Sequence, residues 1–172
     1  DKNILLIDAT NPFGGGYLLP KGRLRESLDG IKRADEIIIS KTNFVQKNIV
    51  DEITNKLKKY NKPISLAVHK EDHFYNQSLV NFPLETIKGK NVLLFSSIAN
   101  PENFKKSILK LEPKSVKEIK FSDHHIYSDI EIEEISREAV DYDFIITTEK
   151  DIVKIKKNIE NMLVLKISFD IV

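Results

Sequence analysis

Short apolar runs alternate with longer amphipathic segments along the whole chain. The runs cover residues 4–7, 37–39, 64–68, 92–95, 116–121, 144–147 and 162–167. Their largely continuous apolar character is typical of strands that are covered on both faces. The alternation therefore predicts an α/β fold with a mostly parallel sheet, helices on both faces and right-handed crossovers.

Two segments between the runs differ in pattern. Residues 44–60 carry Val45, Ile49, Ile53 and Leu57 at helical spacing with lysines opposite, which predicts an amphipathic helix. Residues 69–90 show no sustained period and are expected to form a long connection. We place a boundary near residues 61–63, which gives an incomplete first lobe over residues 1–62 and a second α/β lobe over residues 63–172.

Composition narrows the function classes. With 172 residues and 41% hydrophobic residues, the chain can bury the core of one domain or slightly more. Its formal net charge of +1 excludes a strongly basic nucleic-acid binder, and we expect no nucleic-acid partner. The lack of cysteine excludes a disulfide framework and a thiolate metal site.

The sequence shows no membrane-spanning run and no N-terminal signal peptide. No apolar run approaches the roughly 18 residues that span a bilayer, and no signal peptide opens the sequence. Asp1 leads almost at once into the first apolar run, and such a strand needs neighbours. We therefore expect the start of the chain to be a fragment boundary.

Polar residues follow three of the predicted strands. Asn100 with Pro101 predicts a helix start after residues 92–95, and Ser128 with Glu131 forms a capping-box pattern for a helix to about residue 140. Thr148 has capping spacing after residues 144–147, and Lys150 follows it. Ligands bind at this edge of open α/β sheets, and helix N-termini there favour phosphate; the same residues would equally serve as caps alone.

A histidine pair distinguishes the second of these turns. His124 and His125 are adjacent, so their rings diverge and are not expected to bind one metal together. Asp123 can orient a neighbouring imidazole and raise its basicity, which suits a general base or an electrostatic helper. A loop histidine that only hydrogen-bonds the backbone is the alternative. We expect no metal site within this chain.

A glycine-rich turn and a basic segment occupy the first thirty or so residues. Asp8 follows the first predicted strand, then comes a run of three glycines, and after it Lys21, Arg23 and Arg25. Closely spaced arginines can clamp a phosphate because guanidinium binds it bidentately, although a solvated basic face has the same composition. The turn is not a P-loop, since Gly16 and Gly22 are one residue too far apart and Arg23 replaces the required lysine.

Six motifs in order resemble the lipid A 4'-kinase (tetraacyldisaccharide 4'-kinase) family. They are ILLIDATNPFGGGYLLPKGRLRESL (residues 4–28), KRAD (32–35), ISKT (39–42), SIANP (97–101), FSDHHIY (121–127) and ITTEKD (146–151). The resemblance spans about the whole chain. It implies a P-loop-kinase-like enzyme of two α/β lobes joined by a two-stranded link, here residues 64–68 paired with residues 163–172.

The resemblance also implies an activity. The family transfers phosphate from ATP, with Mg²⁺, to the 4'-hydroxyl of a tetraacyl glucosamine disaccharide 1-phosphate in lipid A biosynthesis, at the cytoplasmic face of the bacterial inner membrane. Arg25 and Glu26 match the family's Arg-Glu pair near the phosphates. His124 matches the histidine that, with an aspartate of the other half, assists deprotonation of the sugar hydroxyl. Ser27 replaces a proline that is common in the family.

Several parts of that family pattern are not in this chain. They are the Walker A, the acidic DDGFQH motif, the aspartate partner of the histidine and the amphipathic membrane-facing region. We therefore expect a C-terminal fragment of a kinase that is inactive alone, with ATP and Mg²⁺ held mainly by the other half. A non-catalytic phosphate- and sugar-binding module derived from such a kinase, or a plain Rossmann-like domain with fortuitous matches, are the alternatives.

Overall fold

The computed structural model describes all residues, 1–172, and has an α/β fold of two compact units. The N-terminal unit contains Asp1–Lys70 together with Ser168–Val172, and the C-terminal unit contains Glu71–Ile167. The boundary expected at residues 62 and 63 lies just before a strand, whereas the two units divide within that strand.

The N-terminal unit is a short parallel sheet with one long helix. Its elements are β1 (Ile4–Asp8), η1 (Gly14–Gly16), η2 (Leu28–Arg33), β2 (Glu36–Ser40), η3 (Thr42–Phe44), α1 (Lys47–Lys58) and the first part of β3 (Ile64–Tyr75). β2 lies between β1 and β3 and is parallel to both. The helix expected over residues 44–60 is confirmed over residues 47–58, and the 3-10 turn η3 ends at its first expected residue, Phe44.

The core of the N-terminal unit lies between β2 and α1. Ile37 and Ile39 of β2 are fully buried and cluster with Ile53 and Leu57 of α1, as the helical spacing predicts. In contrast, Leu6 in the middle of β1 is 57% exposed, and β1 is the last strand at its end of the sheet. The expectation that this apolar run is covered on both faces is therefore wrong for β1.

The C-terminal unit is a mixed, mostly parallel sheet. Its elements are the end of β3, β4 (Asn81–Phe82), η4 (Leu84–Ile87), β5 (Asn91–Ser96), α2 (Pro101–Leu109), β6 (Ser115–Lys120), α3 (Asp129–Glu138), η5 (Ala139–Asp141), β7 (Phe144–Thr148), α4 (Glu149–Ile152) and β8 (Met162–Ile171). The strand order is β3-β8-β7-β5-β6, with β4 antiparallel to β3. β5, β6, β7 and β8 run parallel.

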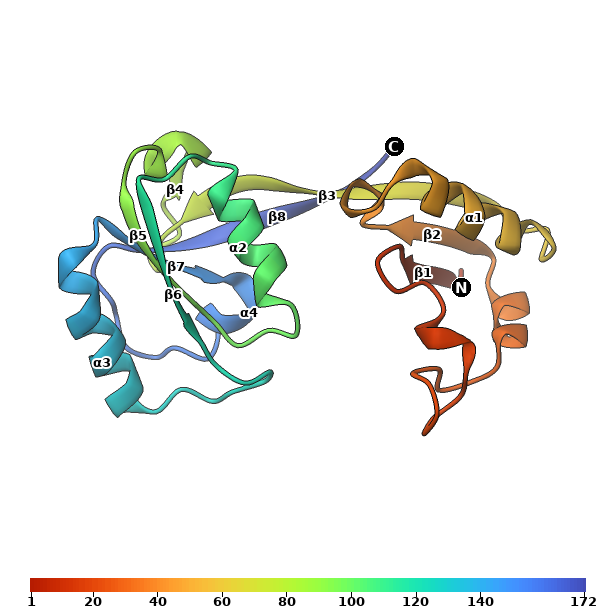
Figure 1. Cartoon of the computed structure of the whole chain (residues 1–172), viewed down its shortest axis with the longest axis horizontal. Helices are drawn as coiled ribbons and strands as arrows, with labels where there is room; N and C mark the ends of the chain where they lie inside the picture. Colours follow the sequence, from red (N-terminus) through yellow and green to blue (C-terminus); the bar gives the residue numbers. More distant parts are fainter. The chain divides into compact units, whose positions relative to one another are not determined.

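Helices cover both faces of this second sheet, as expected. Alternate residues of β5 separate into two cores: Leu94 packs with Ile108 of α2, whereas Leu93 and Phe95 pack with Ile135 of α3. Figure 1 shows α2 and α3 on opposite sides of the strands. A strand buried on both faces requires a continuous apolar sequence, which is what β5 has.

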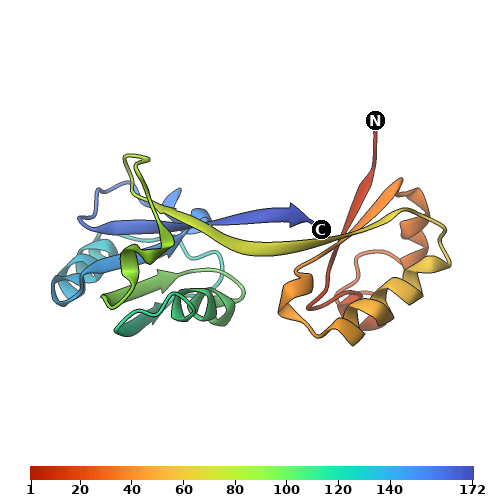
Figure 2. The ribbon, with the colours of Figure 1, turned by 90° about the horizontal axis from the view of Figure 1, so that it is seen from above.

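Two strands link the units, and they confirm the expected two-stranded link. β3 and β8 each contain residues of both units, as can be followed in Figure 2. In the N-terminal unit the amide of Val172 donates to the carbonyl of Leu66 over 2.9 Å. The long connection expected over residues 69–90 is wrong in its first part, because residues 69–75 continue β3.

Candidate functional site

Polar groups of the N-terminal unit gather where β1 and β2 end. Asp8 closes β1, forms an ion pair with Lys41 and accepts hydrogen bonds from the Thr10 amide (2.9 Å) and hydroxyl (2.6 Å). Burial acts to raise the pKa of Asp8, but the hydrogen bonds from Lys41 and Thr10 outweigh it and hold the pKa below its ordinary value. Asp8 is therefore an ionised carboxylate whose partners lie within the turn.

The glycine turn and the basic segment form one folded loop. Gly14, Gly15 and Gly16 all have positive φ, and the amide of Arg23 donates to the carbonyl of Gly14 over 2.9 Å. A side chain at Gly22 would meet the Tyr17 carbonyl oxygen at 2.1 Å, so only glycine allows this close approach. The glycines thus determine where the basic side chains emerge.

The basic side chains of this loop differ in their partners. Arg23 and Arg25 are exposed and form no ion pair, whereas the ammonium of Lys21 lies 4.0 Å from the centroid of the Tyr17 ring. Glu26 forms an ion pair with Arg33 of η2. The segment therefore presents two free guanidinium groups, and its glutamate is already engaged.

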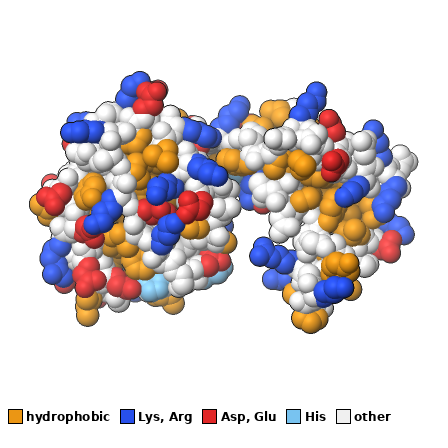
Figure 3. Space-filling view, viewed as in Figure 1, with side chains coloured by type: hydrophobic (Ala, Val, Ile, Leu, Met, Phe, Trp, Pro, Cys, Tyr) orange, Lys and Arg blue, Asp and Glu red, His pale blue; other side chains and the backbone are white.

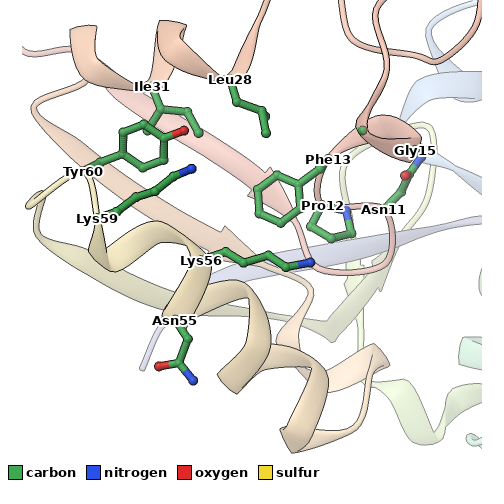
Figure 4. Close-up of a pocket in the computed structure, with 11 residues that line it drawn as sticks. Asn11, Pro12, Phe13, Gly15, Leu28, Ile31, Asn55, Lys56, Lys59 and Tyr60 are labelled. Atoms are coloured by element: carbon green, nitrogen blue, oxygen red, sulfur yellow. The ribbon is translucent and has the colours of Figure 1, made fainter.

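A pocket of about 640 Å³ opens beside the glycine turn in the N-terminal unit (Figure 4). Its lining residues are Asn11, Pro12, Phe13, Gly15, Gly16, Leu28, Ile31, Asn55, Lys56, Lys59 and Tyr60. Lys56 lies 5.7 Å from the centroid of the Phe13 ring, and Lys59 lies 5.1 Å from that of Tyr60. The pocket combines apolar walls with two ammonium groups, which suits an anion with an apolar part.

Sequence reasoning missed the two lysines of this pocket. Lys56 and Lys59 belong to the lysine-rich face of the predicted helix, which is normally a solvated face. Their role in a pocket depends on Phe13 and Leu28, which contribute from a separate loop and from η2. Only the proximity of the lysine-rich helix face to the glycine-rich turn identifies the two lysines. That proximity arises when the chain folds, so the sequence alone does not show it.

In the C-terminal unit all three predicted caps form at one edge of the sheet. Asn100 accepts from the Asn103 amide (3.2 Å), Thr148 accepts from the Asp151 amide (3.3 Å), and Ser128 and Glu131 make both bonds of a capping box. β5, β6 and β7 are parallel, so their carboxyl ends share this edge. Lys150, in the first turn of α4, is exposed there.

The two adjacent histidines have different surroundings. The side chain of His124 is 92% exposed and lies 3.8 Å from the Asp123 carboxylate, too far for a hydrogen bond. The His125 side chain is 26% exposed, bonds Glu131 through Nε2 over 2.9 Å and stacks on Phe121. His124 is therefore available to a ligand, whereas His125 holds the turn against α3.

The backbone of His124 is constrained although its ring is free. Its φ of +61° lies in the left-handed region, which is uncommon for a residue with a Cβ. The His124 amide donates to the carbonyl of Ser97 over 3.1 Å, and the Phe121 amide donates to the carbonyl of Ser96 over 3.2 Å. The loop after β5 thus holds the turn that carries His124.

Charges of both signs are interspersed on the face shown in Figure 3, and histidine is visible at the surface of the C-terminal unit. No group of three or more His, Cys, Asp or Glu side chains is arranged to hold a metal ion. No helix has the length and apolar character needed to cross a bilayer.

The sequence profile described as "Tetraacyldisaccharide-1-P 4'-kinase" matches residues 1–171. The chain belongs to this kinase family. Its relatives include the tetraacyldisaccharide 4'-kinase of Elusimicrobium minutum, 36% identical over 166 residues, and that of Halothermothrix orenii, 32% identical over 172 residues. The alignments cover 95% and 92% of this chain. The family name is that of a kinase in lipid A biosynthesis.

A solved structure has the same fold. The LpxK of Aquifex aeolicus, described as an "apo" form in complex with ATP, aligns with a TM-score of 0.69 at 24% identity and covers 99% of this chain. It confirms the α/β fold expected for a lipid A 4'-kinase.

The chain spans less than half the length of the relatives that it matches. The alignments cover 44% and 45% of the two curated relatives and 48% of the Aquifex aeolicus chain. No pair among the six glycines of this chain fits the Walker A pattern G-x-x-x-x-G-K-[ST].

Proposed function

We propose that this chain is the C-terminal half of a kinase that phosphorylates the 4'-hydroxyl of a tetraacyl glucosamine disaccharide 1-phosphate. The observation that carries the proposal is the family match over residues 1–171 by a chain that covers less than half of its relatives. The phosphate donor is ATP, as in the complex of the Aquifex aeolicus relative.

His124 is the candidate catalytic residue. The exposed imidazole can reach a bound hydroxyl, and the Asp123 carboxylate lies 3.8 Å from it. An aspartate from the other half of the enzyme completes the pair that assists removal of the hydroxyl proton. Asn100, Thr148 and Lys150 lie at the same sheet edge and add helix N-termini and one cation.

Arg25 and Arg23 are the candidate phosphate ligands. Their guanidinium groups are exposed and unpaired, so they are free to bind phosphate oxygens bidentately. Lys21 adds a third cation from the same loop, and Glu26 holds the loop to η2 through Arg33. Asp8 stabilises the neighbouring turn. Phosphoryl transfer depends chiefly on such positioning and charge neutralisation.

ATP and Mg²⁺ bind mainly to the half of the enzyme outside this chain. The basic loop would contact phosphate from its side, while the Walker A and the acidic metal ligands come from the other half. The isolated chain is therefore inactive. The intact enzyme acts at the cytoplasmic face of the bacterial inner membrane, which it contacts through that other half, and its partners are the lipid disaccharide and the missing half itself.

The alternative is a non-catalytic module that retains the phosphate- and sugar-binding surface. The two proposals differ in what the gene encodes before Asp1. A G-x-x-x-x-G-K-[ST] motif followed by paired aspartates supports the kinase. An initiating methionine directly before Asp1 supports the module.

The direct test is product analysis with the full-length enzyme, meaning the product of the whole gene. Incubation with ATP, Mg²⁺ and tetraacyldisaccharide 1-phosphate is expected to give a bisphosphate with the new group at the 4'-position, located by mass spectrometry and NMR. Phosphorylation at another position, or none with any acylated disaccharide, contradicts the proposal.

A further inference from the structure

Asp151 is a buried carboxylate that the proposed function does not use. It lies in the first turn of α4 and is fully buried, yet four donors surround it. The donors are the Ser97 amide (3.1 Å), the Ser97 hydroxyl (2.5 Å), the Thr148 hydroxyl (2.8 Å) and the Lys154 ammonium (3.0 Å). A buried carboxylate with this many partners is a fixed structural anion.

The network keeps Asp151 charged. Burial acts to raise the pKa of Asp151, but the hydrogen bonds from Ser97, Lys154 and Thr148 outweigh it and lower the pKa below its ordinary value. Two of the four bonds go to Ser97, which is 54 residues away in the sequence. Asp151, at the start of α4, therefore fixes the loop that follows β5.

The same loop holds the backbone of His124. The carbonyl of Ser97 accepts the His124 amide, and the amide and hydroxyl of Ser97 are the groups that bond Asp151. Ser97 is hydrogen-bonded both to Asp151 and to the His124 amide. A shift of Asp151 would therefore move Ser97 and, with it, the backbone of His124. The left-handed φ of His124 makes this support necessary, since an unsupported residue would relax from it.

A nucleophilic role for Ser97 is excluded by its surroundings. The Lys154 ammonium lies 2.6 Å from the Ser97 hydroxyl, an arrangement that resembles a Ser–Lys pair. However, Ser97 is only 2% exposed and its hydroxyl donates to Asp151. No substrate atom reaches it, so the network serves to hold the loop.

We propose that Asp151 is a positioning residue for His124, acting through Ser97. The inference rests on the proposed function only in assigning chemistry to His124. Its structural part, that the carboxylate fixes the turn at residues 122–125, stands on the hydrogen bonds of Ser97 with Asp151 and with the His124 amide. A misplacement of about 1 Å at a reacting group can cost about a hundredfold in rate.

The test combines exchange and kinetics for Asp151→Asn. In the full-length enzyme, the amide of His124 is expected to exchange with solvent at least about tenfold faster, measured by hydrogen–deuterium exchange of the peptide over residues 121–127. In the full-length enzyme, kcat is expected to fall at least about tenfold with the KM for ATP unchanged. Unchanged exchange at His124 overturns the inference.

Asp143→Asn is the matched control. Asp143 accepts the Asn91 amide over 2.8 Å at the opposite end of β5, as Asp151 accepts the Ser97 amide. Its substitution is expected to leave His124 exchange and kcat unchanged. Equal effects of the two substitutions would mean a general loss of stability and would overturn the inference.

A double-variant cycle separates positioning from simple destabilisation. If Asp151 acts through His124, Asp151→Asn adds less than about twofold to the loss of kcat in a His124→Ala background, because the residue that it positions is gone. If the two substitutions lower kcat by independent factors that multiply in the double variant, the inference is overturned. If Asp151→Asn does not fold, Ser97→Ala removes the hydroxyl's bonds to Asp151 and Lys154 but keeps the bond from the Ser97 amide to Asp151. An intermediate rise in exchange at His124 is then expected, and unchanged exchange overturns the inference.

The two proposals fail in different ways. If His124→Ala leaves kcat of the full-length enzyme near normal, the assigned chemistry of His124 is wrong while the exchange result still stands. If His124→Ala is impaired and Asp151→Asn changes neither exchange nor kcat, the positioning role is wrong and the proposed function stands.

Discussion

His124 and His125 are neighbours in the sequence, but their side chains lie in different environments. His125 is held by Glu131 and stacks on Phe121 at 4.9 Å between ring centroids, so its ring belongs to the packing of the turn. The His124 ring lies in solvent beside Asp123. A ring that meets a substrate must be accessible, and this property separates the two.

We expect His124→Ala to lower kcat of the full-length enzyme by at least about tenfold, because a charge-stabilising group at the reacting hydroxyl contributes several kcal/mol. His125→Ala should lower kcat less and should lower the melting temperature instead, because it removes a packed ring. Steady-state kinetics and thermal unfolding of both variants provide the measurement. A larger loss of kcat for His125→Ala would reverse the assignment.

Arg25 is the second residue on which the proposed site depends. We expect Arg25→Ala to lower kcat/KM by at least about tenfold, because an unpaired guanidinium beside phosphate supplies bidentate charge-assisted hydrogen bonds. Arg137→Ala, on the exposed surface of α3, is the matched control and should have little effect. Equal, near-normal rates for both variants would remove Arg25 from the site.

The helices of the C-terminal unit begin where local sequence rules place them. The caps of α2, α3 and α4 depend on residues three positions apart, and the sequence therefore predicts Asn100, Ser128 and Thr148 correctly. Contacts between segments that are far apart in the sequence cannot be predicted from such local rules. The bond from Ser97 to Asp151 and the pocket between α1 and Phe13 arise only when the chain folds.

The strands show the same limit. β5 is recognisable because both of its faces are buried and its sequence is continuously apolar. The second half of β3 is not recognisable, because residues 69–75 include charged side chains that a half-exposed link strand tolerates. The exposure of Leu6 in β1 depends on which segments cover that face of the sheet, and the residues of β1 do not encode that.

The capping box of α3 gives a pH dependence of stability. The Ser128 amide and hydroxyl, together with His125, lower the pKa of Glu131 from 4.5 to about 2. A pKa depressed by folding stabilises the folded state above the unfolded value, and this contribution is lost as pH falls through the folded value. Glu131 therefore stabilises the protein above about pH 4.5.

We expect Glu131→Gln to lower the melting temperature at pH 7, because the charged acceptor of the capping box is lost. The difference in melting temperature between Glu131→Gln and the wild-type protein should shrink as pH falls from 4.5 to about 2, because Glu131 itself becomes protonated in this range. Thermal unfolding across this pH range is the measurement. Glu133→Gln, two residues along α3 and ion-paired with Lys157 at the surface, is the control and should change the melting temperature less. A pH-independent difference for Glu131→Gln would contradict the argument.

At the scale of the whole molecule, the chain has the fold of its family but spans less than half the length of its relatives. The unpaired arginines lie in the N-terminal unit, and His124 lies in the C-terminal unit. The chain contains no Walker A, and phosphoryl transfer needs the nucleotide phosphates to be held. The central claim is therefore that this polypeptide requires the remainder of the enzyme for activity.

The most direct test compares phosphate transfer from radiolabelled ATP to tetraacyldisaccharide 1-phosphate by the isolated 172-residue chain and by the full-length enzyme at equal concentration. The account predicts labelled lipid with the full-length enzyme and none above background with the isolated chain. Labelled lipid formed by the isolated chain, or none formed by the full-length enzyme, would contradict it.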